Sequence, residues 1–413
     1  MQSEATVVSS NPMLTIIGLL AVLLAYGFWE FRTHQRNLRR IPIRIHVNGT
    51  RGKSSVTRLI AAGLRTGPRR TVAKTTGTTP RLILEDGTEL PISRAGSPNI
   101  IEQLMVVREA QARGAEILVV ECMAVQPHLQ WVAEERMIQS TLGVITNARA
   151  DHLDQMGPTV VNVAEALSNT IPHRSIVYTA EVPLLPVFQA KAALKHSAVV
   201  SCDPRTVTDE DLARFSYVEH KDNVALALAV CQHFGIERRA ALDAMVRATP
   251  DSGALQAHRI HFFAKDLLFY TAFAANDRDS TIMIYHRLGL ENRPDHPVLL
   301  IVNNRGDRLQ RAEQFGELIA TDLDAQHVFL VGDFTNATHN IALRRGFPPD
   351  RISDLGQCTV DELFEAVVEQ VPHSATILGV GNIGGMGKEI VTFFKNRGEE
   401  WSRKPSVSGS FSA

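Results

Sequence analysis

The residue types best suited to chemistry lie in one glycine-rich run early in the chain. Residues 43–55 read Ile-Arg-Ile-His-Val-Asn-Gly-Thr-Arg-Gly-Lys-Ser-Ser. In such a run, glycines let backbone N–H groups approach phosphate oxygens, Lys53 can supply a positive charge, and the Ser54 hydroxyl can bind Mg²⁺. The run therefore predicts a nucleotide-phosphate site made of Gly49, Thr50, Arg51, Gly52, Lys53, Ser54 and Ser55.

The run departs from the general P-loop pattern at one position, because the first glycine of that pattern falls where this chain has Val47. An ordinary strand-to-helix turn with a solvated lysine is therefore the alternative. The flanking residues favour the phosphate site. Alternating apolar residues, as in a buried strand, precede the loop, and apolar residues at helical spacing follow it: Val56, Leu59, Ile60 and Leu64.

Two further apolar runs end in residues that could hold a metal or a phosphate. Ile117–Cys122 ends at Glu121, and Leu142–Asn147 leads into Asp151-His152-Leu153-Asp154. In open α/β sheets ligands bind at the carboxyl ends of the strands, so Glu121 is placed to reach a metal near Ser54. A surface acid at a strand end is the alternative for Glu121. The Asp-His-x-x-Asp cluster predicts metal or phosphate chemistry.

A threonine-rich run at residues 74–81 reads Lys-Thr-Thr-Gly-Thr-Thr-Pro-Arg. Its hydroxyls and two cations could contact an anionic ligand, and a plain turn is an equal alternative. We therefore predict substrate contacts by Lys74, Thr78 and Arg81.

Composition limits the possible classes of protein. The 413 residues, 44% hydrophobic and 21% charged, predict two or three globular domains at about 150 residues each. A net charge of -1 gives no indication of a nucleic-acid partner. The four cysteines lie far apart, which argues against a disulfide framework or a zinc site and fits a reducing compartment.

An uncharged segment precedes the globular part. Met13–Trp29 contains no Asp, Glu, Lys or Arg and is just long enough to span a bilayer. A cleaved signal peptide is the alternative, but no basic residue precedes the segment and no small-residue cleavage site follows it. Arginines cluster on its C-terminal side, so the positive-inside rule predicts a single-pass anchor in the cell inner (cytoplasmic) membrane with the catalytic part in the cytoplasm.

Alternation of apolar strands and helical segments predicts an α/β protein. After the phosphate-loop domain the alternation restarts, with strands expected at Leu267–Phe273, Val298–Val302, Val328–Val331 and Ala375–Val380. We predict a membrane anchor (1–40), a P-loop-type parallel-sheet ATPase domain (41–254), a smaller C-terminal α/β substrate domain (255–396) and a disordered tail (397–413). Thr249–Gly253 is the predicted hinge.

One further glycine motif supports a competing function. Gly379-Val380-Gly381-Asn382-Ile383-Gly384 matches the dinucleotide-binding fingerprint. That fingerprint requires another strand carrying Asp or Glu about 20 residues later, whereas here one helix and a polar tail remain. A nicotinamide-dependent oxidoreductase is therefore the weakest alternative, and we interpret the motif as a glycine turn lining an interdomain cleft.

The glycine run, the Glu121 strand end and residues 151–154 together resemble the ATP-binding core of the Mur ligase superfamily, which includes the folylpolyglutamate synthases. More narrowly, residues 45–55, 74–81 and 121–127 resemble the membrane-anchored ligase subunits of poly-γ-glutamate synthases, and the likeness covers nearly the whole chain. It implies ATP-dependent ligation of glutamate through γ-carboxyl groups by way of an acyl phosphate, for a capsule or secreted polymer. ATP and Mg²⁺ would be cofactors, and a polytopic membrane subunit and accessory export subunits would be partners.

The resemblance also implies residue roles. Lys53 and the loop amides would hold the triphosphate, and Ser54, Glu121 and His152 would ligate Mg²⁺, which makes Lys53, Glu121 and His152 the catalytic residues. In the same way, Asn223, in a motif with His220, would contact the adenine, and Arg259 would contact a phosphate of the nucleotide. The predicted glutamate site, where an arginine can grip a carboxylate, comprises Asn276, Arg305, Asp307 and Arg308.

This chain also departs from the superfamily at two places. Residues 166–172 offer no counterpart of the lysine that many Mur ligases carbamylate for a second magnesium, and Thr271 replaces the expected ribose-binding acid. Exposed loop arginines are common, so a solvated loop is the alternative for Arg305 and Arg308. Two other functions stay open: another ligase of the superfamily, acting on a peptidoglycan precursor or folate, and a membrane-tethered regulatory P-loop ATPase.

Overall fold

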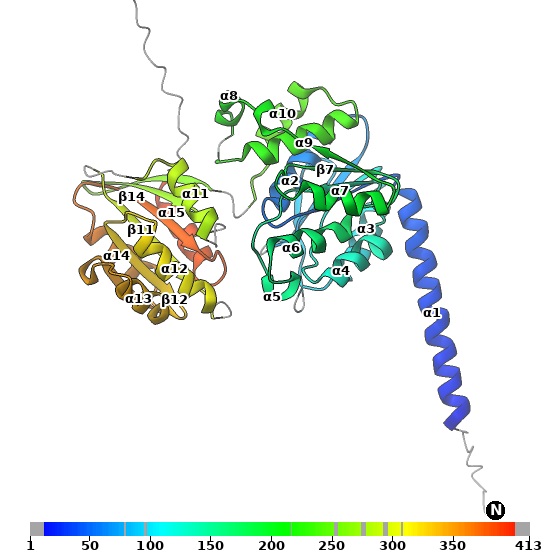
Figure 1. Cartoon of the computed structure of the whole chain (residues 1–413), viewed down its shortest axis with the longest axis horizontal. Coiled ribbons are helices and arrows are strands. Elements are labelled where there is room, and N and C mark those ends of the chain that lie inside the picture. The colour runs from blue at the N-terminus through cyan, green and yellow to red at the C-terminus, as the bar shows by residue number, and fades with distance from the viewer. Residues whose placement is uncertain are drawn as a thin grey trace, which may run out of the picture. The chain divides into compact units, whose positions relative to one another are not determined.

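The computed structural model describes residues 12–77, 80–94, 96, 98–215, 217–251, 255–273, 278–291, 296–306 and 309–400. The chain forms two compact units (Figure 1). Unit 1 comprises the chain up to Cys202 together with Leu226–Ala241, and unit 2 comprises Asp203–Ala225 and the chain from Leu242. Some predicted features lie outside the described residues, namely Thr78, Asn276, Asp307, Arg308, part of the hinge and most of the tail.

Unit 1 is built on an eight-stranded sheet in the order β4-β3-β2-β5-β1-β6-β7-β8. Its central strands pair in parallel, and a β3–β4 hairpin adds an antiparallel edge. The strands are β1 (Ile43–Asn48), β2 (Thr71–Lys74), β3 (Arg81–Ile83), β4 (Glu89–Pro91), β5 (Ile117–Glu121), β6 (Leu142–Ile145), β7 (Ile176–Thr179) and β8 (Ala198–Ser201). Burial on both faces explains why β5 and β6 read as continuous apolar runs and not as alternating ones.

Helices connect these parallel strands. They are α2 (Lys53–Leu64), α3 (Glu102–Ala112), α4 (Pro127–Val132), the π-helix η1 (Ala133–Ile138), α5 (Leu153–Met156), α6 (Val160–Leu167), the short η2 (Ser168–Thr170) and α7 (Leu185–Leu194). The predicted strand–loop–helix run is β1–α2. The two predicted strands that end near Glu121 and Asn147 are β5 and β6. These three strands are neighbours at the centre of the sheet, so this part of the prediction is confirmed.

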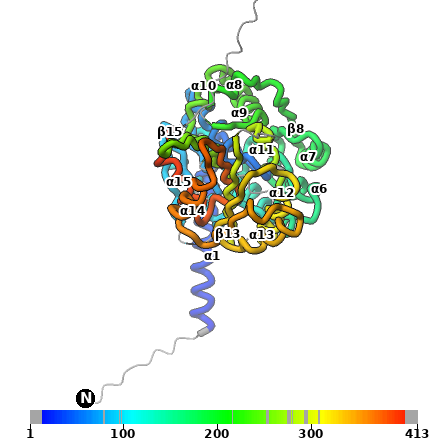
Figure 2. Tube along the Cα trace, turned by 90° about the vertical axis from the view of Figure 1, so that its left-hand side faces the viewer, coloured from blue at the N-terminus to red at the C-terminus, as the bar shows by residue number. Residues whose placement is uncertain are grey.

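Helix α1 (Pro12–Arg40) precedes the sheet as one uninterrupted helix. Figures 1 and 2 show it projecting from unit 1. Its large apolar side chains from Met13 to Phe31 are exposed, and among the described residues it is the one helix long and apolar enough to cross a membrane. The helix extends beyond the predicted span because the polar residues that follow Trp29 continue helically and pack on unit 1.

Unit 2 contains a seven-stranded sheet in the order β13-β12-β11-β14-β10-β9-β15. Its strands are β9 (Ala257–Phe262), β10 (Lys265–Thr271), β11 (Val298–Asn304), β12 (His327–Gly332), β13 (Ile352–Gly356), β14 (Ser374–Gly381) and β15 (Glu399–Glu400). The four strands expected from the sequence are β10, β11, β12 and β14, which are confirmed. The edge strands β9, β13 and β15 were not predicted, because they carry exposed polar residues in place of an apolar run.

Two apolar layers cover the faces of this sheet. One layer includes Tyr285 of α11 (Arg278–Arg287), Phe315 of α12 (Leu309–Thr321) and Ala342 of α13 (Thr335–Arg344). The other includes residues of α14 (Val360–Glu369) and α15 (Gly387–Arg397). The remaining elements are η3 (Pro204–Thr206), α8 (Asp209–Ala213), η4 (Pro349–Arg351), and α9 (Lys221–His233) and α10 (Arg238–Val246), which divide between the units.

Candidate functional site

The loop between β1 and α2 has a backbone that only glycine adopts without strain. Gly49 has φ +134° and Gly52 has φ +79°. A Cβ at Gly49 would lie 1.9 Å from the Thr146 Oγ1, so the loop passes directly against the end of β6. The two glycines therefore turn the chain from β1 into the N-terminus of α2, where unpaired backbone N–H groups and the helix dipole favour an anion.

Asn147, after β6, holds this loop in shape. Its Oδ1 accepts hydrogen bonds from Thr50 Oγ1 (2.7 Å) and from the Arg51 backbone N–H (3.1 Å). The Arg51 carbonyl in turn accepts from Thr146 Oγ1 at 2.6 Å and from Asn147 Nδ2 at 3.2 Å. Asn147 was not among the predicted site residues; the polar pair Thr146-Asn147, which follows the strand beside the loop, was the available signal.

Lys53 is the first residue of α2, and its ammonium folds back over the loop. Nζ donates to the carbonyl oxygens of Gly49 (2.6 Å) and Thr50 (3.3 Å). The positive charge is thereby held above the loop amides, where a bound phosphate would replace the carbonyls as its partner. The predicted role of Lys53 as the phosphate-neutralising residue remains a prediction that this geometry accommodates.

Ser54, in the first turn of α2, meets Glu121 at the end of β5. Ser54 Oγ donates to Glu121 Oε2 at 2.8 Å, and the same oxygen accepts the Thr76 backbone N–H at 2.6 Å. Among the described residues no three His, Cys, Asp or Glu side chains form a metal-binding group. Magnesium, however, is commonly held by one or two protein oxygens together with substrate phosphates and water. The Ser54–Glu121 pair, beside the phosphate loop, fits that donor set.

His152 stands at the start of α5 with a left-handed backbone, φ +48°. Its Nε2 is 4.0 Å from Asp151 Oδ1, and the same oxygen is 3.7 Å from Arg51 Nη2. Because β6 pairs in parallel with β1, His152 follows the strand next to the phosphate loop, at the same edge of the sheet as Glu121. Its predicted part in a shared metal site with Ser54 and Glu121 stays a prediction.

A fully buried ion pair joins β1, which carries His46, to η1, which carries Glu134. His46 Nδ1 is 2.7 Å from Glu134 Oε2, and the other Glu134 oxygen accepts from the Ser140 backbone N–H and hydroxyl. Burial alone would lower the pKa of His46, but Cys122 and the Glu134 carboxylate raise it to about 10. The imidazolium therefore forms part of the folded unit at neutral pH. This pair was not predicted, because its members are far apart along the chain.

This ion pair predicts a pH dependence of stability. His46 stays protonated in the folded chain up to a pKa of about 10, but only up to its ordinary value of 6.5 when unfolded. Its stabilisation is thus complete below pH 6.5 and is lost as pH rises to about 10. We expect Glu134→Gln to lower stability at pH 6.5 by roughly 3–5 kcal/mol, the usual cost of breaking a buried pair, and to flatten the decline between the two pH values.

Thermal denaturation in detergent at pH 6.5, 8 and 10 measures this effect. Glu109→Gln, at a half-exposed residue of α3 paired with Arg113, is the matched control and should melt like the wild type throughout. Parallel pH profiles for Glu134→Gln and the wild type would contradict the proposed pair.

Lys74 is buried with a carboxylate partner. Its Nζ lies 2.7 Å from Glu102 Oε1, and Arg94 binds the same carboxylate at 2.6 Å. Burial lowers the pKa of Lys74, against the opposing effect of Glu102. The charge of Lys74 is thus already balanced by the Glu102 carboxylate, and a substrate that Lys74 contacts would have to share the ammonium with it. Arg81 opens β3 and is half-buried; its substrate role, like that of Lys74, remains a prediction.

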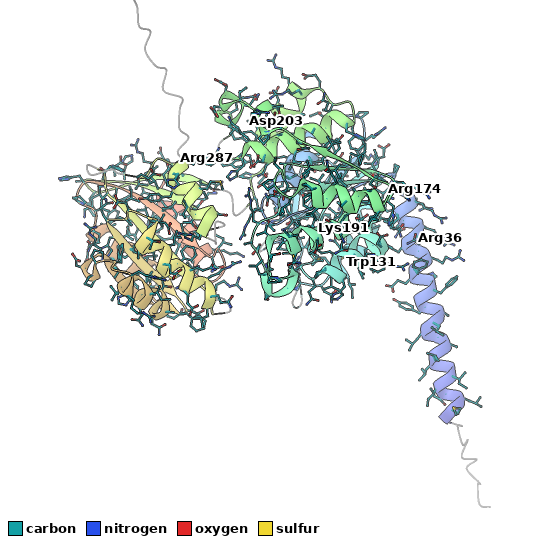
Figure 3. All side chains as sticks on the ribbon, in the orientation of Figure 1. Arg36, Trp131, Arg174, Lys191, Asp203 and Arg287 are labelled. Carbon is teal, nitrogen blue, oxygen red and sulfur yellow. The ribbon has the colours of Figure 1, made fainter. Side chains whose placement is uncertain are left out.

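The predicted adenine motif belongs to unit 2 at the start of α9. Buried Glu219 accepts hydrogen bonds from the Asn223 side-chain amide and from the His220 backbone N–H, both at 2.8 Å. Arg287 of α11, labelled in Figure 3, donates to the Glu219 carbonyl at 2.7 Å and to His220 Nδ1 at 3.2 Å. Burial and Arg287 lower the pKa of His220 to about 4, so its imidazole is neutral. Glu219 and Arg287 therefore orient a motif of which sequence analysis identified only His220 and Asn223.

The C-terminal glycine motif is used for packing. A Cβ at Gly381 would lie 2.4 Å from the Asn303 carbonyl oxygen, and one at Gly384 would lie 3.0 Å from Arg305 Nη1. Asn303 Nδ2 also donates to the Gly384 carbonyl at 2.9 Å. These contacts place the predicted substrate residue Arg305 over the glycine turn. After α15, β15 pairs antiparallel with β9, so the parallel strand that a dinucleotide site requires is not formed by the described residues.

Arg259 lies on β9 and is half exposed. Its Nη2 is 3.0 Å from Asp266 Oδ2 of the neighbouring β10. The predicted phosphate contact of Arg259 stays a prediction, since in this structure the guanidinium is engaged by a carboxylate on the adjacent strand.

Comparison with known sequences identifies the family. Residues 257–397 match the model of the poly-gamma-glutamate synthase CapB C-terminal domain, and residues 47–237 match that of the Mur ligase middle domain. The chain is 37% identical to PGA synthase CapB of Bacillus subtilis over 92% of this chain and 97% of that protein. It is 38% identical to the capsule biosynthesis protein CapB of Bacillus anthracis over 92% of this chain and 82% of that one. The chain belongs to the CapB family.

Solved structures show that this CapB family member has the fold of Mur ligases and folylpolyglutamate synthases. A folylpolyglutamate synthase of Mycobacterium tuberculosis, complexed with ADP and AMPPCP, aligns with a TM-score of 0.66 at 17% identity, covering 94% of this chain and 100% of that one. MurF of Acinetobacter baumannii aligns with a TM-score of 0.63 at 15% identity, covering 90% and 80%. The expected α/β fold is confirmed.

Proposed function

We propose that this CapB family member joins glutamate residues through their γ-carboxyl groups by an acyl-phosphate mechanism that uses the β1–α2 loop. As a member of the family, the chain is an ATP-dependent ligase of poly-γ-glutamate synthesis. The observation that carries the mechanism is the meeting of Ser54 and Glu121 beside the lysine of a phosphate loop. That constellation suits activation of a carboxylate by phosphate transfer, because it neutralises charge on phosphoryl oxygens.

The proposed reaction has two steps. A γ-carboxylate oxygen at the growing end of the polymer bonds to the γ-phosphorus of ATP, and ADP leaves with the electron pair of the broken P–O bond. The amine of an incoming glutamate then bonds to the acyl carbon, phosphate leaves, and the nitrogen loses a proton. Lys53 and the loop amides stabilise the charge on the phosphate oxygens during the first step.

Ser54 and Glu121 are the residues proposed to hold Mg²⁺, with His152 as the predicted third ligand. When bound, the ion would neutralise charge on the phosphate oxygens. On the adenosine side, Asn223 is proposed to meet the adenine, held in orientation by Glu219, with Arg259 as the predicted phosphate contact. Lys74, Thr78 and Arg81 are proposed contacts of the acidic polymer.

We further propose that α1 anchors the enzyme in the cytoplasmic membrane with both units in the cytoplasm. The exposed apolar surface of α1 and the arginines that follow it support this orientation. A polytopic membrane subunit and accessory export subunits are the proposed partners, since a cytoplasmic polymer must cross the bilayer. The anchor, ATP-binding domain, C-terminal domain and tail are proposed to divide at residues 40, 254 and 396.

Arg305 provides a test that separates the ligase from its alternatives. If its guanidinium grips the carboxylate of the incoming glutamate, Arg305→Ala removes a charge-assisted contact worth about 1.5–3 kcal/mol. We therefore expect a roughly 10- to 100-fold loss of glutamate-dependent kcat/KM with ATP binding retained. The measurement is ADP release by the detergent-solubilised protein with and without glutamate.

Arg344→Ala, at an exposed arginine of α13, is the matched control and should behave as the wild type. A membrane-tethered regulatory ATPase would release ADP without requiring glutamate. An oxidoreductase would bind NADH saturably and be indifferent to the change at Arg305. Either outcome would overturn the proposed reaction.

A further inference from the structure

The last turns of α1 are part of the folded body of unit 1. His34 and Leu38 are buried, and His34 Nε2 is hydrogen-bonded to the carbonyl oxygen of Met137 in η1 at 2.8 Å. The helix runs without interruption from Pro12 to Arg40, so the exposed apolar segment and the docked turns form one rigid element. No loop between them absorbs rotation of unit 1 about the helix.

Arg44 fixes the junction between this C-terminal end of α1 and the rest of unit 1. Its guanidinium donates to the carbonyl oxygens of Leu38 (3.1 Å), in the last turn of α1, and Ile41 (2.6 Å), just after it. It also donates to those of Ile138 (3.0 Å), the last residue of η1, and Gln139 (2.7 Å). One half-buried cation thus ties the helix end to η1 and to β1, on which Arg44 itself lies. The orientation of α1 relative to unit 1 is therefore set by the fold.

The helix geometry fixes how close unit 1 comes to the bilayer. From Trp29, the last residue of the uncharged segment, to His34, the first buried one, the axial rise is about 7.5 Å at 1.5 Å per residue. A headgroup layer is roughly 5–7 Å thick on each side of the hydrocarbon core. The surface of unit 1 that surrounds His34 therefore lies within reach of the headgroups when α1 spans the membrane, and the tilt of α1 in the bilayer decides which side of that surface meets them.

That surface is basic and carries an exposed tryptophan. Arg36, Arg39 and Arg40 are exposed on α1, and Arg136 of η1 is exposed beside Met137, with its guanidinium 5.5 Å from the ring centre of Trp131 on α4. Figure 3 labels Arg36 on α1 and Trp131 on the neighbouring part of unit 1. We call these five residues the collar.

Acidic residues near the collar do not cancel its charge. Glu134 is buried against His46, and Glu135 is paired with Lys195 and His173. Glu30 is the acidic residue of α1 itself and lies on the bilayer side of the arginines. Arginine beside an exposed tryptophan is the combination that suits the polar–apolar boundary of a membrane containing anionic lipid.

We propose that the collar binds the headgroups of anionic phospholipids and holds unit 1 in one orientation against the membrane surface. The proposal rests on the proposed role of α1 as the membrane anchor. A polymerising enzyme held in this way would present its phosphate loop at a fixed height and angle to the bilayer, through which its product is to leave.

Fluorescence of Trp131 in the full-length chain tests the proposal. The chain has three tryptophans, so Trp29→Phe with Trp401→Phe leaves Trp131 as the one reporter. This protein is reconstituted into nanodiscs of phosphatidylcholine, with or without phosphatidylglycerol, each with or without a nitroxide on a fraction of the headgroups. We expect quenching of Trp131 to be at least two-fold stronger with phosphatidylglycerol, and to fall to the phosphatidylcholine level when Arg36, Arg39 and Arg136 are all changed to Gln.

A control with equal charge loss changes three exposed arginines of unit 2, Arg247, Arg344 and Arg351, to Gln and should keep the strong quenching. Equal quenching in the two lipids, or quenching insensitive to the collar arginines, would overturn the proposal. Failure of α1 as an anchor is seen separately, because the protein would then not enter nanodiscs of either composition.

Discussion

Lys53→Ala is expected to lower the rate of glutamate-dependent ADP formation by about 10²–10³-fold, the usual cost of losing one preorganised charge donor to a transition state. Lys53 is half-buried, and its ammonium donates hydrogen bonds to the carbonyl oxygens of Gly49 and Thr50, so the variant loses polar contacts of the loop. The melting temperature should therefore change little. Steady-state ADP release and thermal denaturation of the same preparation measure the two effects.

Lys191→Ala is the control for this variant. Lys191 is an exposed lysine on α7 of the same unit, labelled in Figure 3, and its removal takes away an equal charge far along the chain from the loop. We expect its rate to match that of the wild type. Polymer synthesis at the wild-type rate by Lys53→Ala would show that Lys53 and its loop take no part in the reaction.

The strand, glycine loop and helix that begin unit 1's sheet could be predicted because their signals are local. Alternating apolar residues, two glycines and a helical apolar pattern all fall within 43–64, and each has the same physical cause in any chain. Asn147 could not be assigned in that way. Its hydrogen bonds to Thr50 and Arg51 exist because β6 pairs with β1, and that pairing is a property of the assembled sheet.

The partners of buried charged residues could not be predicted either. Lys74 was expected to contact a ligand, but no local pattern indicated that it would pair with Glu102, which also binds Arg94. A buried charge requires a partner, but which residue supplies it depends on tertiary packing. His46 with Glu134, and Arg44 with the Gln139 carbonyl oxygen, are further cases in which the partners are distant in sequence.

The glycine motif at residues 379–384 shows that a literal match can have another cause. Its glycines fit because the Asn303 carbonyl and the Arg305 side chain occupy the space where Cβ atoms would lie. An acidic strand does follow the motif, because β15 carries Glu399 and Glu400, but it pairs antiparallel with β9 at the edge of the sheet and not beside β14, as a dinucleotide site would require. A motif needs its structural context before it indicates a ligand.

Glu121→Gln is expected to reduce turnover at least 100-fold and to raise the Mg²⁺ concentration needed for half-maximal rate more than ten-fold. Glutamine has nearly the shape of glutamate, and its carbonyl oxygen can still accept from Ser54 Oγ and from the Thr76 backbone N–H. The packing around this buried strand end is thereby kept, while the negative charge that attracts the cation is lost. Titration of ADP release with Mg²⁺ measures both quantities.

The matched control is Glu116→Gln, just before the start of the same strand, where the carboxylate accepts the Arg70 backbone N–H and lies away from the loop. It should leave the Mg²⁺ titration unchanged. The decisive comparison is between the two variants at saturating Mg²⁺. If Glu121→Gln recovers the full wild-type rate there, the carboxylate contributes only to metal affinity. If its titration overlays that of Glu116→Gln, Glu121 holds no metal, and its hydrogen bonds to Ser54 and Thr76 serve only to shape the end of the sheet.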